Sequence, residues 1–180
     1  MTIRPADPAR DAAACAAIYA PSVESAPISF ELVAPDADEF VCRIATYSAT
    51  HQFLVAESGG EVVGYAYACP WEERAAYRWA VESSVYVAAG HHGEGIGRAL
   101  YAELFDRLRA QGFRTVVAGV TLPNPASIAL HEGMGFERIG SLRSIGWKGG
   151  NWHDVGYWQL DLAPPEEGMP AEPSPPGPTA

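Results

Sequence analysis

The chain has 180 residues and a formal net charge of −10, and its length fits a single domain. An apolar content of 48% is enough for a packed core and excludes a wholly disordered chain. The negative charge disfavours a nucleic-acid partner, because phosphate binding needs a basic face. The first residues lack a signal peptide's basic start and apolar core, and no stretch reaches the ~18 apolar residues of a membrane helix. We therefore expect a cytoplasmic protein with no nucleic-acid or membrane contact.

The cysteine and histidine residues do not indicate a disulfide framework or a metal site. Cys15, Cys42 and Cys69 are far apart in the sequence, and their number is odd. The five histidines form no cluster with metal-ligand spacing. We therefore predict no bound metal.

Helical and strand patterns alternate along the first half of the chain. Residues 2–6 are a plausible strand, and an Ala-rich helix begins at residue 9 and is expected to stop at Pro21. A second helix is predicted at 36–48, with three side chains in register on one face, Phe40, Ile44 and Tyr47. Residues 52–58 and 62–70 flank Ser-Gly-Gly-Glu, which predicts a hairpin.

The second half continues this alternation. A strand at 81–89 precedes a helix at 94–112, which is expected to bury Ile96, Leu100, Leu104 and Leu108 and to end at Gly112. A strand at 113–121 leads to a short helix at 124–135, with Asn124 as its N-cap and Pro125 at its first position. Two closing strands are predicted at 136–145 and 152–162.

The last segment differs in composition from the rest. Residues 163–180 are rich in Pro, Glu and Gly and contain no aromatic residue, so they cannot bury enough surface to offset the entropy of ordering. We predict one α/β domain at 1–162 and a disordered Pro/Glu-rich tail at 163–180.

Three glycines stand where a predicted strand enters a predicted helix: Gly93, Gly95 and Gly97. A helix N-terminus has unpaired N–H groups and a partial positive charge, and glycine lets a phosphate approach them closely. A Rossmann motif is excluded because Leu100 occupies its third glycine position, and a P-loop is excluded because no Lys follows. The glycines alone leave two alternatives, a diphosphate-binding loop and a glycine-rich turn that binds nothing.

The segment "SVYVAAGHHGEGIGRAL" resembles the coenzyme A loop of the GCN5-related N-acetyltransferase (GNAT) superfamily, [Q/R]-x-x-G-x-[G/A], with His92 at the Gln/Arg position. "NPASIALHEGMGF" resembles the helix that follows in that superfamily. "PWEERAAYRWAVESSVYV" and "GGNWHDVGYWQLDL" are similar to the phosphinothricin / methionine sulfoximine N-acetyltransferase subfamily. The resemblance extends from near residue 1 to about Leu162.

This resemblance implies a GNAT fold, with a mixed, mostly antiparallel sheet of about seven strands, flanked by helices and splayed at the acetyl-CoA site. It implies direct acetyl transfer from acetyl-CoA to the α-amine of a small polar amino-acid analogue, in a ternary complex, and a homodimer. The resemblance assigns the cofactor to Val85, Tyr86, Val87, His92, Gly93, Glu94, Gly95, Ile96, Gly97, Arg98, Asn124 and Ser127.

Two residues are the catalytic candidates. Glu82 lies at the start of the strand before the glycine loop, where a carboxylate can take the amine proton; the alternative is a solvated strand-edge Glu. His131 occupies the position of the superfamily's proton donor to the coenzyme A sulfur, and its pKa range suits that role; the alternative is a packed helix-surface His. Tyr101 is a second candidate for the donor, although packing is its more ordinary role.

Arg74 and Tyr77 precede Glu82 in the sequence. A guanidinium and a phenol suit an acceptor substrate that has an anionic group. The resemblance assigns the acceptor to Arg74 and Tyr77, with aromatic walls at Phe30 and Tyr67; the last two fit core packing equally well. Glu72 stands where the subfamily often has Lys, which removes a positive charge and weakens the case for phosphinothricin itself.

Two other functions remain open from the sequence. One is a GNAT enzyme acting on a protein N-terminus, an aminoglycoside or a polyamine; the other is a non-catalytic acyl-CoA sensor. A serine hydrolase is a poor fit, because no G-x-S-x-G motif occurs.

Overall fold

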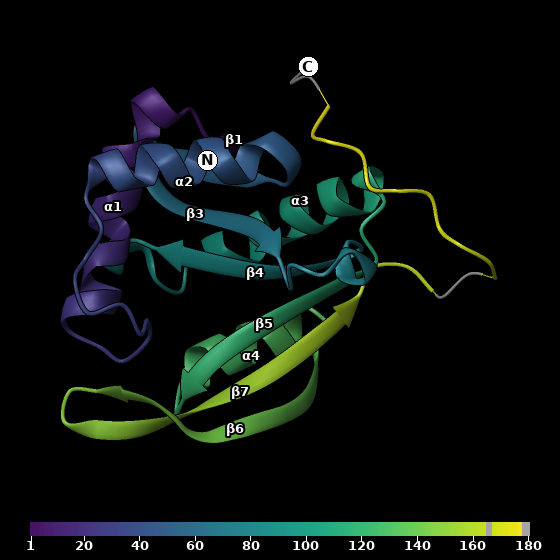
Figure 1. Ribbon diagram of the computed structural model, residues 1–180. Coiled ribbons are helices and arrows are strands. Elements are labelled where there is room, and N and C mark those ends of the chain that lie inside the picture. Colours follow the sequence, from purple (N-terminus) through teal and green to yellow (C-terminus); the bar gives the residue numbers. More distant parts are fainter. Residues whose placement is uncertain (165–166, 178–180) are drawn as a thin grey trace.

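The computed structural model describes residues 1–164 and 167–177, and in it one seven-stranded sheet carries helices on both faces (Figure 1). The strands are β1 (Thr2–Pro5), β2 (Phe53–Ser58), β3 (Glu61–Pro70), β4 (Ala80–Val87), β5 (Thr115–Leu122), β6 (Glu137–Lys148) and β7 (Asn151–Asp161). The helices are α1 (Pro8–Glu24), α2 (Ala37–Thr50), α3 (Ile96–Gln111) and α4 (Pro125–Gly133), with two short 3₁₀ turns, η1 (Ala75–Tyr77) and η2 (Ala89–His91).

The strand order is β1-β2-β3-β4-β5-β7-β6. Every neighbouring pair is antiparallel except β4 and β5, which are parallel. The predicted mixed, mostly antiparallel sheet of about seven strands is confirmed.

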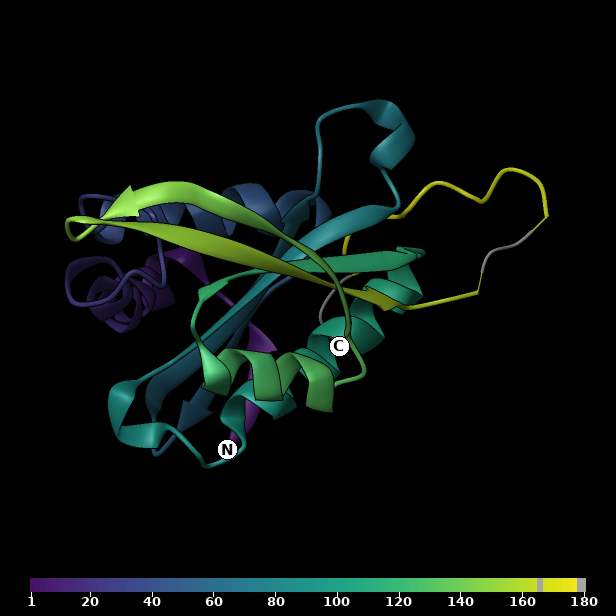
Figure 2. The ribbon, with the colours of Figure 1, turned by 90° about the horizontal axis from the view of Figure 1, so that it is seen from below.

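Alternation along the central strands divides the interior into two cores. On β2, Leu54 and Ala56 belong to the core under α3, whereas Phe53 and Val55 belong to the core under α1 and α2. The predicted buried face of α3 is confirmed, since Ile96, Leu100, Leu104 and Leu108 all lie in the first of these cores. Both faces of the sheet are therefore covered where β2, β3 and β4 run through the centre (Figure 2).

The prediction that Pro21 ends the first helix is wrong. Helix α1 continues to Glu24, and the Ser25 N–H donates to the Pro21 carbonyl oxygen over 3.0 Å. Proline removes one N–H donor from the helix interior. Tyr19 and Val23, on either side of it, are both buried, and this burial offsets the lost hydrogen bond.

The predicted caps of the third and fourth helices are confirmed, although α3 begins at Ile96, two residues after the predicted start. Gly112 ends α3 with φ 95°, a left-handed conformation that favours glycine. Asn124 Oδ1 accepts from the Ser127 N–H over 3.1 Å at the start of α4, and Pro125 opens that helix. Helix α4 ends at Gly133, two residues before the predicted boundary.

The last strand ends at Asp161, close to the predicted domain boundary at 162. Residues 167–177 contain neither helix nor strand. Residues 165–166 and 178–180 of the predicted tail lie outside the described residues, and the disorder of 163–180 stays a prediction. Among the described helices, none has the length and apolar character needed to cross a membrane.

Candidate active site

The parallel strands β4 and β5 pair over a short distance and then separate. The paired residues on β4 are Ala80, Val81 and Glu82, opposite Thr115, Val116 and Val117. Beyond this point the two strands diverge toward their carboxyl ends (Figure 1). The predicted splay of the sheet is confirmed, and Glu82 is the last β4 residue before the opening.

The Glu82 carboxylate is partly buried beside this opening. A Cβ added at Gly119 on β5 would lie 3.7 Å from Glu82 Oε1 and 3.4 Å from the Tyr157 ring, so the carboxylate reaches across to β5 and β7. Burial raises the pKa of Glu82 above its ordinary value, because desolvation disfavours the charged form. A carboxyl with a raised pKa is suited to accept a proton near neutral pH.

A cysteine lies next to Glu82 on the neighbouring strand. Cys69 on β3 pairs with Glu82 on β4. Burial, and then the nearby Glu82, raise the pKa of the Cys69 thiol to about 12. The thiol therefore stays protonated at neutral pH and is a poor nucleophile.

The glycine loop connects β4 with α3 at the open end of the split. Gly93 and Gly95 have φ values of 83° and 81°, and a Cβ added at either would meet nothing within 4 Å. Gly95 is also the N-cap of α3, so the unpaired amides of the first turn face a loop without side-chain obstruction. His92 Nε2 lies 2.9 Å from the Val87 carbonyl oxygen, which ties the loop to the end of β4.

Helices α3 and α4 are joined by polar contacts. Arg98 donates from both terminal nitrogens to the Gly133 carbonyl oxygen, at 3.2 and 2.5 Å. His131 and Tyr101 form a second bridge, because Tyr101 Oη lies 3.2 Å from His131 Nε2. Both of these side chains are buried.

The hydrogen bonds of His131 define its tautomer. Nδ1 lies 2.7 Å from the Ser127 carbonyl oxygen, which can only accept, so Nδ1 carries a hydrogen. Burial lowers the pKa of His131 and favours the neutral ring. Nε2 of the neutral ring is then an acceptor, and the Tyr101 hydroxyl donates to it.

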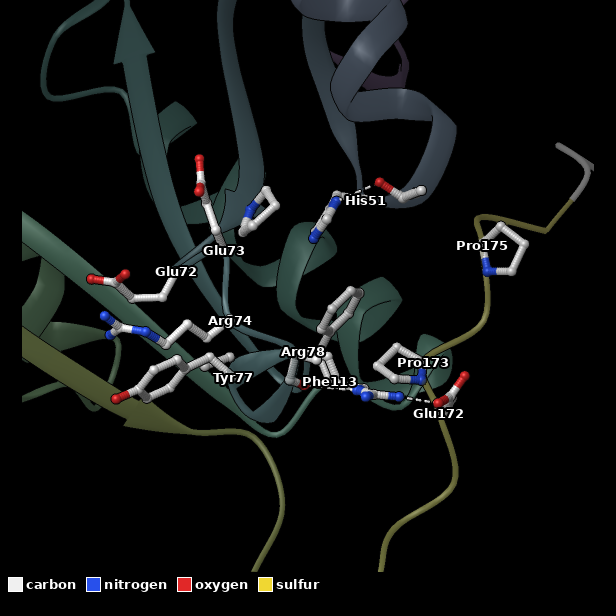
Figure 3. A pocket seen from close by; sticks show the side chains of 14 residues that line it. His51, Glu72, Glu73, Arg74, Tyr77, Arg78, Phe113, Glu172, Pro173 and Pro175 are labelled. Atoms are coloured by element: carbon white, nitrogen blue, oxygen red, sulfur yellow. Dashed lines mark hydrogen bonds and ion pairs between the residues drawn. The ribbon is translucent and has the colours of Figure 1, made fainter.

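A cavity of about 680 Å³ lies at the other end of β4. Arg74 and Tyr77, from the segment around η1, line it and extend in the same direction (Figure 3). Ala80 also lines this cavity and stands two positions before Glu82. Residues two apart on a strand face the same side, about 7 Å from each other, so Ala80 shares a face of β4 with Glu82, which does not itself line the cavity.

The two predicted aromatic walls lie in different places. Tyr67 stacks on Tyr47 with a centroid distance of 5.2 Å, on the strand next to Glu82. Phe30 packs instead on the β6–β7 hairpin, where its ring would lie 2.4 Å from a Cβ added at Gly146. Its ring centroid is 6.2 Å from that of His153.

His153 and Asp154 make hydrogen bonds within the β6–β7 hairpin. His153 Nε2 lies 3.0 Å from the Lys148 carbonyl oxygen, and Asp154 Oδ1 accepts from the Ser144 N–H over 2.7 Å. Both contacts are within the β6–β7 hairpin, so these side chains fix its shape.

Three neighbours of Glu82 were missed from the sequence: Tyr47, Gly119 and Tyr157. Tyr157 and Tyr47 have pKa values raised by burial and, to a smaller extent, by the Glu82 charge. They come from α2, β5 and β7, and no motif in the sequence links them. Within residues 1–164 and 167–177, no group of three or more His, Cys, Asp or Glu side chains is placed to hold a metal ion.

Comparisons with known proteins identify the family of the chain. The profile of the acetyltransferase (GNAT) family matches residues 21–136. The phosphinothricin N-acetyltransferase of Streptomyces viridochromogenes is 42% identical over 96% of this chain and 94% of its own. An L-methionine sulfoximine/L-methionine sulfone acetyltransferase of Salmonella typhimurium is 39% identical over 90% of this chain and 95% of its own.

The fold of this chain also matches that of a solved structure. That structure is a phosphinothricin acetyltransferase of Sinorhizobium meliloti in complex with acetyl-CoA, 36% identical to this chain, with a TM-score of 0.90. The match covers 96% of this chain and 94% of the chain in that structure. These relatives favour an acetyl-CoA-dependent N-acetyltransferase over a non-catalytic sensor. The chain belongs to the acetyltransferase (GNAT) family.

Proposed function

We propose that the protein acetylates the α-amine of a small polar amino-acid analogue of the phosphinothricin, methionine sulfoximine or methionine sulfone type. The observation that carries this proposal is the position of Glu82, at the point where β4 and β5 part, two residues along β4 from Ala80, which lines a cavity together with Arg74. Two relatives whose names contain these substrates match nearly the whole chain.

The glycine loop suits the diphosphate of acetyl-CoA. Gly93 and Gly95 have the left-handed backbone and the open space that a close approach of phosphate oxygens requires. Acetyl-CoA supplies the acetyl group as an activated thioester. We assign its binding to the backbone of Val85–Val87, the loop His92–Gly97, Arg98, and the α4 residues Asn124 and Ser127.

Glu82 is the proposed general base. An α-amine is protonated at neutral pH and must lose a proton before it attacks. The raised pKa of the Glu82 carboxyl brings it nearer to neutral pH, where a base is most effective. Transfer is direct, because the neighbouring Cys69 thiol, with a pKa of about 12, is not a thiolate that could take the acetyl group first.

His131 acts through Tyr101 in this proposal. Its Nδ1 hydrogen is bound to the Ser127 carbonyl oxygen and its Nε2 accepts from Tyr101. A proton that leaves this pair therefore leaves from the Tyr101 hydroxyl, and Nε2 holds that hydroxyl in place. The pair bridges α3 and α4.

The acceptor's anionic group is assigned to Arg74. This side chain makes no hydrogen bond or ion pair with a described residue, and it lines the cavity beside the Tyr77 phenol. A free guanidinium offers a bidentate site for a carboxylate. Glu72 in the same cavity adds negative charge where the related subfamily often has Lys.

We further propose that two copies of the chain associate through the β6–β7 hairpin. Five large apolar side chains of this hairpin are exposed: Ile139, Leu142, Ile145, Trp147 and Trp152. Exposed apolar patches of this kind mark association sites. Light scattering coupled to size exclusion should give twice the mass of the 19.2 kDa chain, and Trp147→Glu should halve it.

A substrate panel tests the proposed activity. Release of free coenzyme A is measured with methionine sulfone, methionine sulfoximine, phosphinothricin, an aminoglycoside, a polyamine and an N-terminal peptide. The proposal expects turnover of at least one of the three amino-acid analogues, with a higher kcat/KM than any of the other amines. Preference for a peptide, aminoglycoside or polyamine would contradict it.

A further inference from the structure

Two arginines, Arg74 and Arg78, line the cavity beside η1 and differ in the contacts that they make. The Arg74 side chain makes no hydrogen bond or ion pair with a described residue. Arg78 has three contacts: its Nε donates to the Ala75 carbonyl oxygen over 2.7 Å, its Nη1 pairs with the Glu172 carboxylate, and its guanidinium lies over the Trp79 ring. One cation is therefore available to a ligand, and the other is occupied by a carboxylate of the same chain (Figure 3).

Glu172 belongs to a segment that lies along the rim of the cavity, residues 171–175, here called the C-terminal strap. Glu172, Pro173 and Pro175 line the cavity. The Trp79 indole N–H donates to the Ala171 carbonyl oxygen over 2.8 Å. The strap is thereby joined to the same segment that carries Arg74, Tyr77 and Arg78.

The other end of the strap is held by α3. The Ser174 N–H donates to the Gln111 carbonyl oxygen, and Gln111 Nε2 donates to the Ser174 carbonyl oxygen, both over 2.8 Å. A Cβ added at Gly112 would lie 3.7 Å from Pro173 Cα, so the strap runs close against the end of α3. Contacts on both sides of Glu172 therefore hold its carboxylate at the cavity.

We propose that Glu172 sets the charge selectivity of the amine-substrate pocket by occupying Arg78; this inference rests on the proposed function. With Glu172 in place, the described residues that line the cavity include one guanidinium without a side-chain partner, that of Arg74, and three carboxylates, those of Glu72, Glu73 and Glu172. Such a pocket disfavours a substrate with a second anionic group. Loss of the Glu172 charge frees Arg78 and makes the pocket less negative.

Two of the proposed substrates form a matched pair for this question. Methionine sulfone and phosphinothricin have the same amino-acid end and the same chain length to a methyl-bearing centre with two oxygens. The sulfone is neutral, whereas the phosphinate carries one negative charge at neutral pH. The ratio of kcat/KM for phosphinothricin to that for methionine sulfone therefore isolates the effect of this one charge.

The experiment measures this ratio in the full-length protein, in Glu172→Gln and in Glu172→Lys. Glu172→Gln should raise the ratio about two- to fivefold, the range expected for one exposed charge pair, and Glu172→Lys should raise it further. Glu167→Gln and Glu167→Lys make the same charge changes in the same tail, at a residue that does not line the cavity, and should leave the ratio unchanged. In an Arg78→Gln background, Glu172→Gln should have a smaller effect.

Three results would overturn the inference. They are an unchanged ratio in both Glu172 variants, an equal rise in the Glu167 variants, and an undiminished rise in the Arg78→Gln background. In each case turnover by the wild type leaves the proposed function standing. Turnover of neither amino acid by the wild type would instead remove the proposed function and this inference with it.

Discussion

Glu82 on β4 and Gly119 on β5 face each other where the two strands part, and a Cβ added at Gly119 would lie 3.7 Å from Glu82 Oε1. Gly119 is exposed, so the absence of its side chain leaves the carboxylate open to an incoming amine. The strand pairing places this gap beside Tyr157 on β7. The site therefore depends on a small residue as well as on an acidic one.

A larger side chain at position 119 should obstruct this approach. Gly119→Val is expected to lower kcat/KM for the amine at least tenfold, since misplacement of a reactant by about 1 Å costs that much or more. The dissociation constant of acetyl-CoA, measured by calorimetry, should stay within about twofold. Gly140→Val on β6, where an added Cβ meets nothing within 4 Å, is the matched control, and an equal loss of activity there would contradict the account.

Cys69 should be dispensable for chemistry although it pairs with Glu82. The pKa of its thiol, raised to about 12 by burial and by the Glu82 charge, leaves almost no thiolate at pH 7. Cys69→Ala is expected to retain kcat within about threefold. Mass spectrometry of the wild type mixed with acetyl-CoA alone should show no acetylated protein, and a stable 42 Da adduct on Cys69 would contradict direct transfer.

Removal of the Arg74 guanidinium should affect the binding of the amine substrate only. Arg74→Ala is expected to raise the KM for the amino-acid analogue about tenfold or more, the loss of a charge-assisted hydrogen bond, while the KM for acetyl-CoA stays the same. Arg107→Ala on α3, which removes one surface charge paired with Glu103, serves as the control. Equal changes in both KM values for Arg74→Ala would argue against this assignment.

Tyr101 and His131 should behave as one unit. Tyr101→Phe and His131→Phe each leave a buried polar atom without its partner, at a cost of about 1–3 kcal/mol in unfolding free energy. Each should also lower kcat, and the double variant should lose no more activity than either single one. Urea unfolding and initial rates measure both quantities, and additive losses of activity would show that the two side chains act separately.

The predictions that succeeded depend on local patterns. The buried face of α3 follows from helical spacing, and the Asn124 cap follows from a single residue type before Pro125. The conformation of the glycine loop likewise needs only the residues of the loop and the helix after it. A physical argument confined to neighbours in sequence is sufficient for each of these features.

The features that were missed depend on contacts between distant segments. Tyr157 lies beside Glu82 only because β7 pairs with β5, and Phe30 lies on Gly146 only because the α1–α2 loop reaches the hairpin. Helix α1 continues through Pro21 because tertiary burial outweighs the local penalty. The strap contacts at Trp79 and Gln111 are also long-range.

The central claim is that Glu82 removes the amine proton during acetyl transfer, and the pH profile of Glu82→Gln tests it most directly. In the wild type, kcat/KM for methionine sulfone should fall as the pH drops through the Glu82 pKa, which burial places above the ordinary 4.5, because only the carboxylate can accept a proton. Glu82→Gln should reduce kcat by about 10²-fold or more, lose this acid limb, and bind acetyl-CoA as the wild type does. Near-normal turnover by Glu82→Gln at pH 7, with the acid limb intact, would contradict the account.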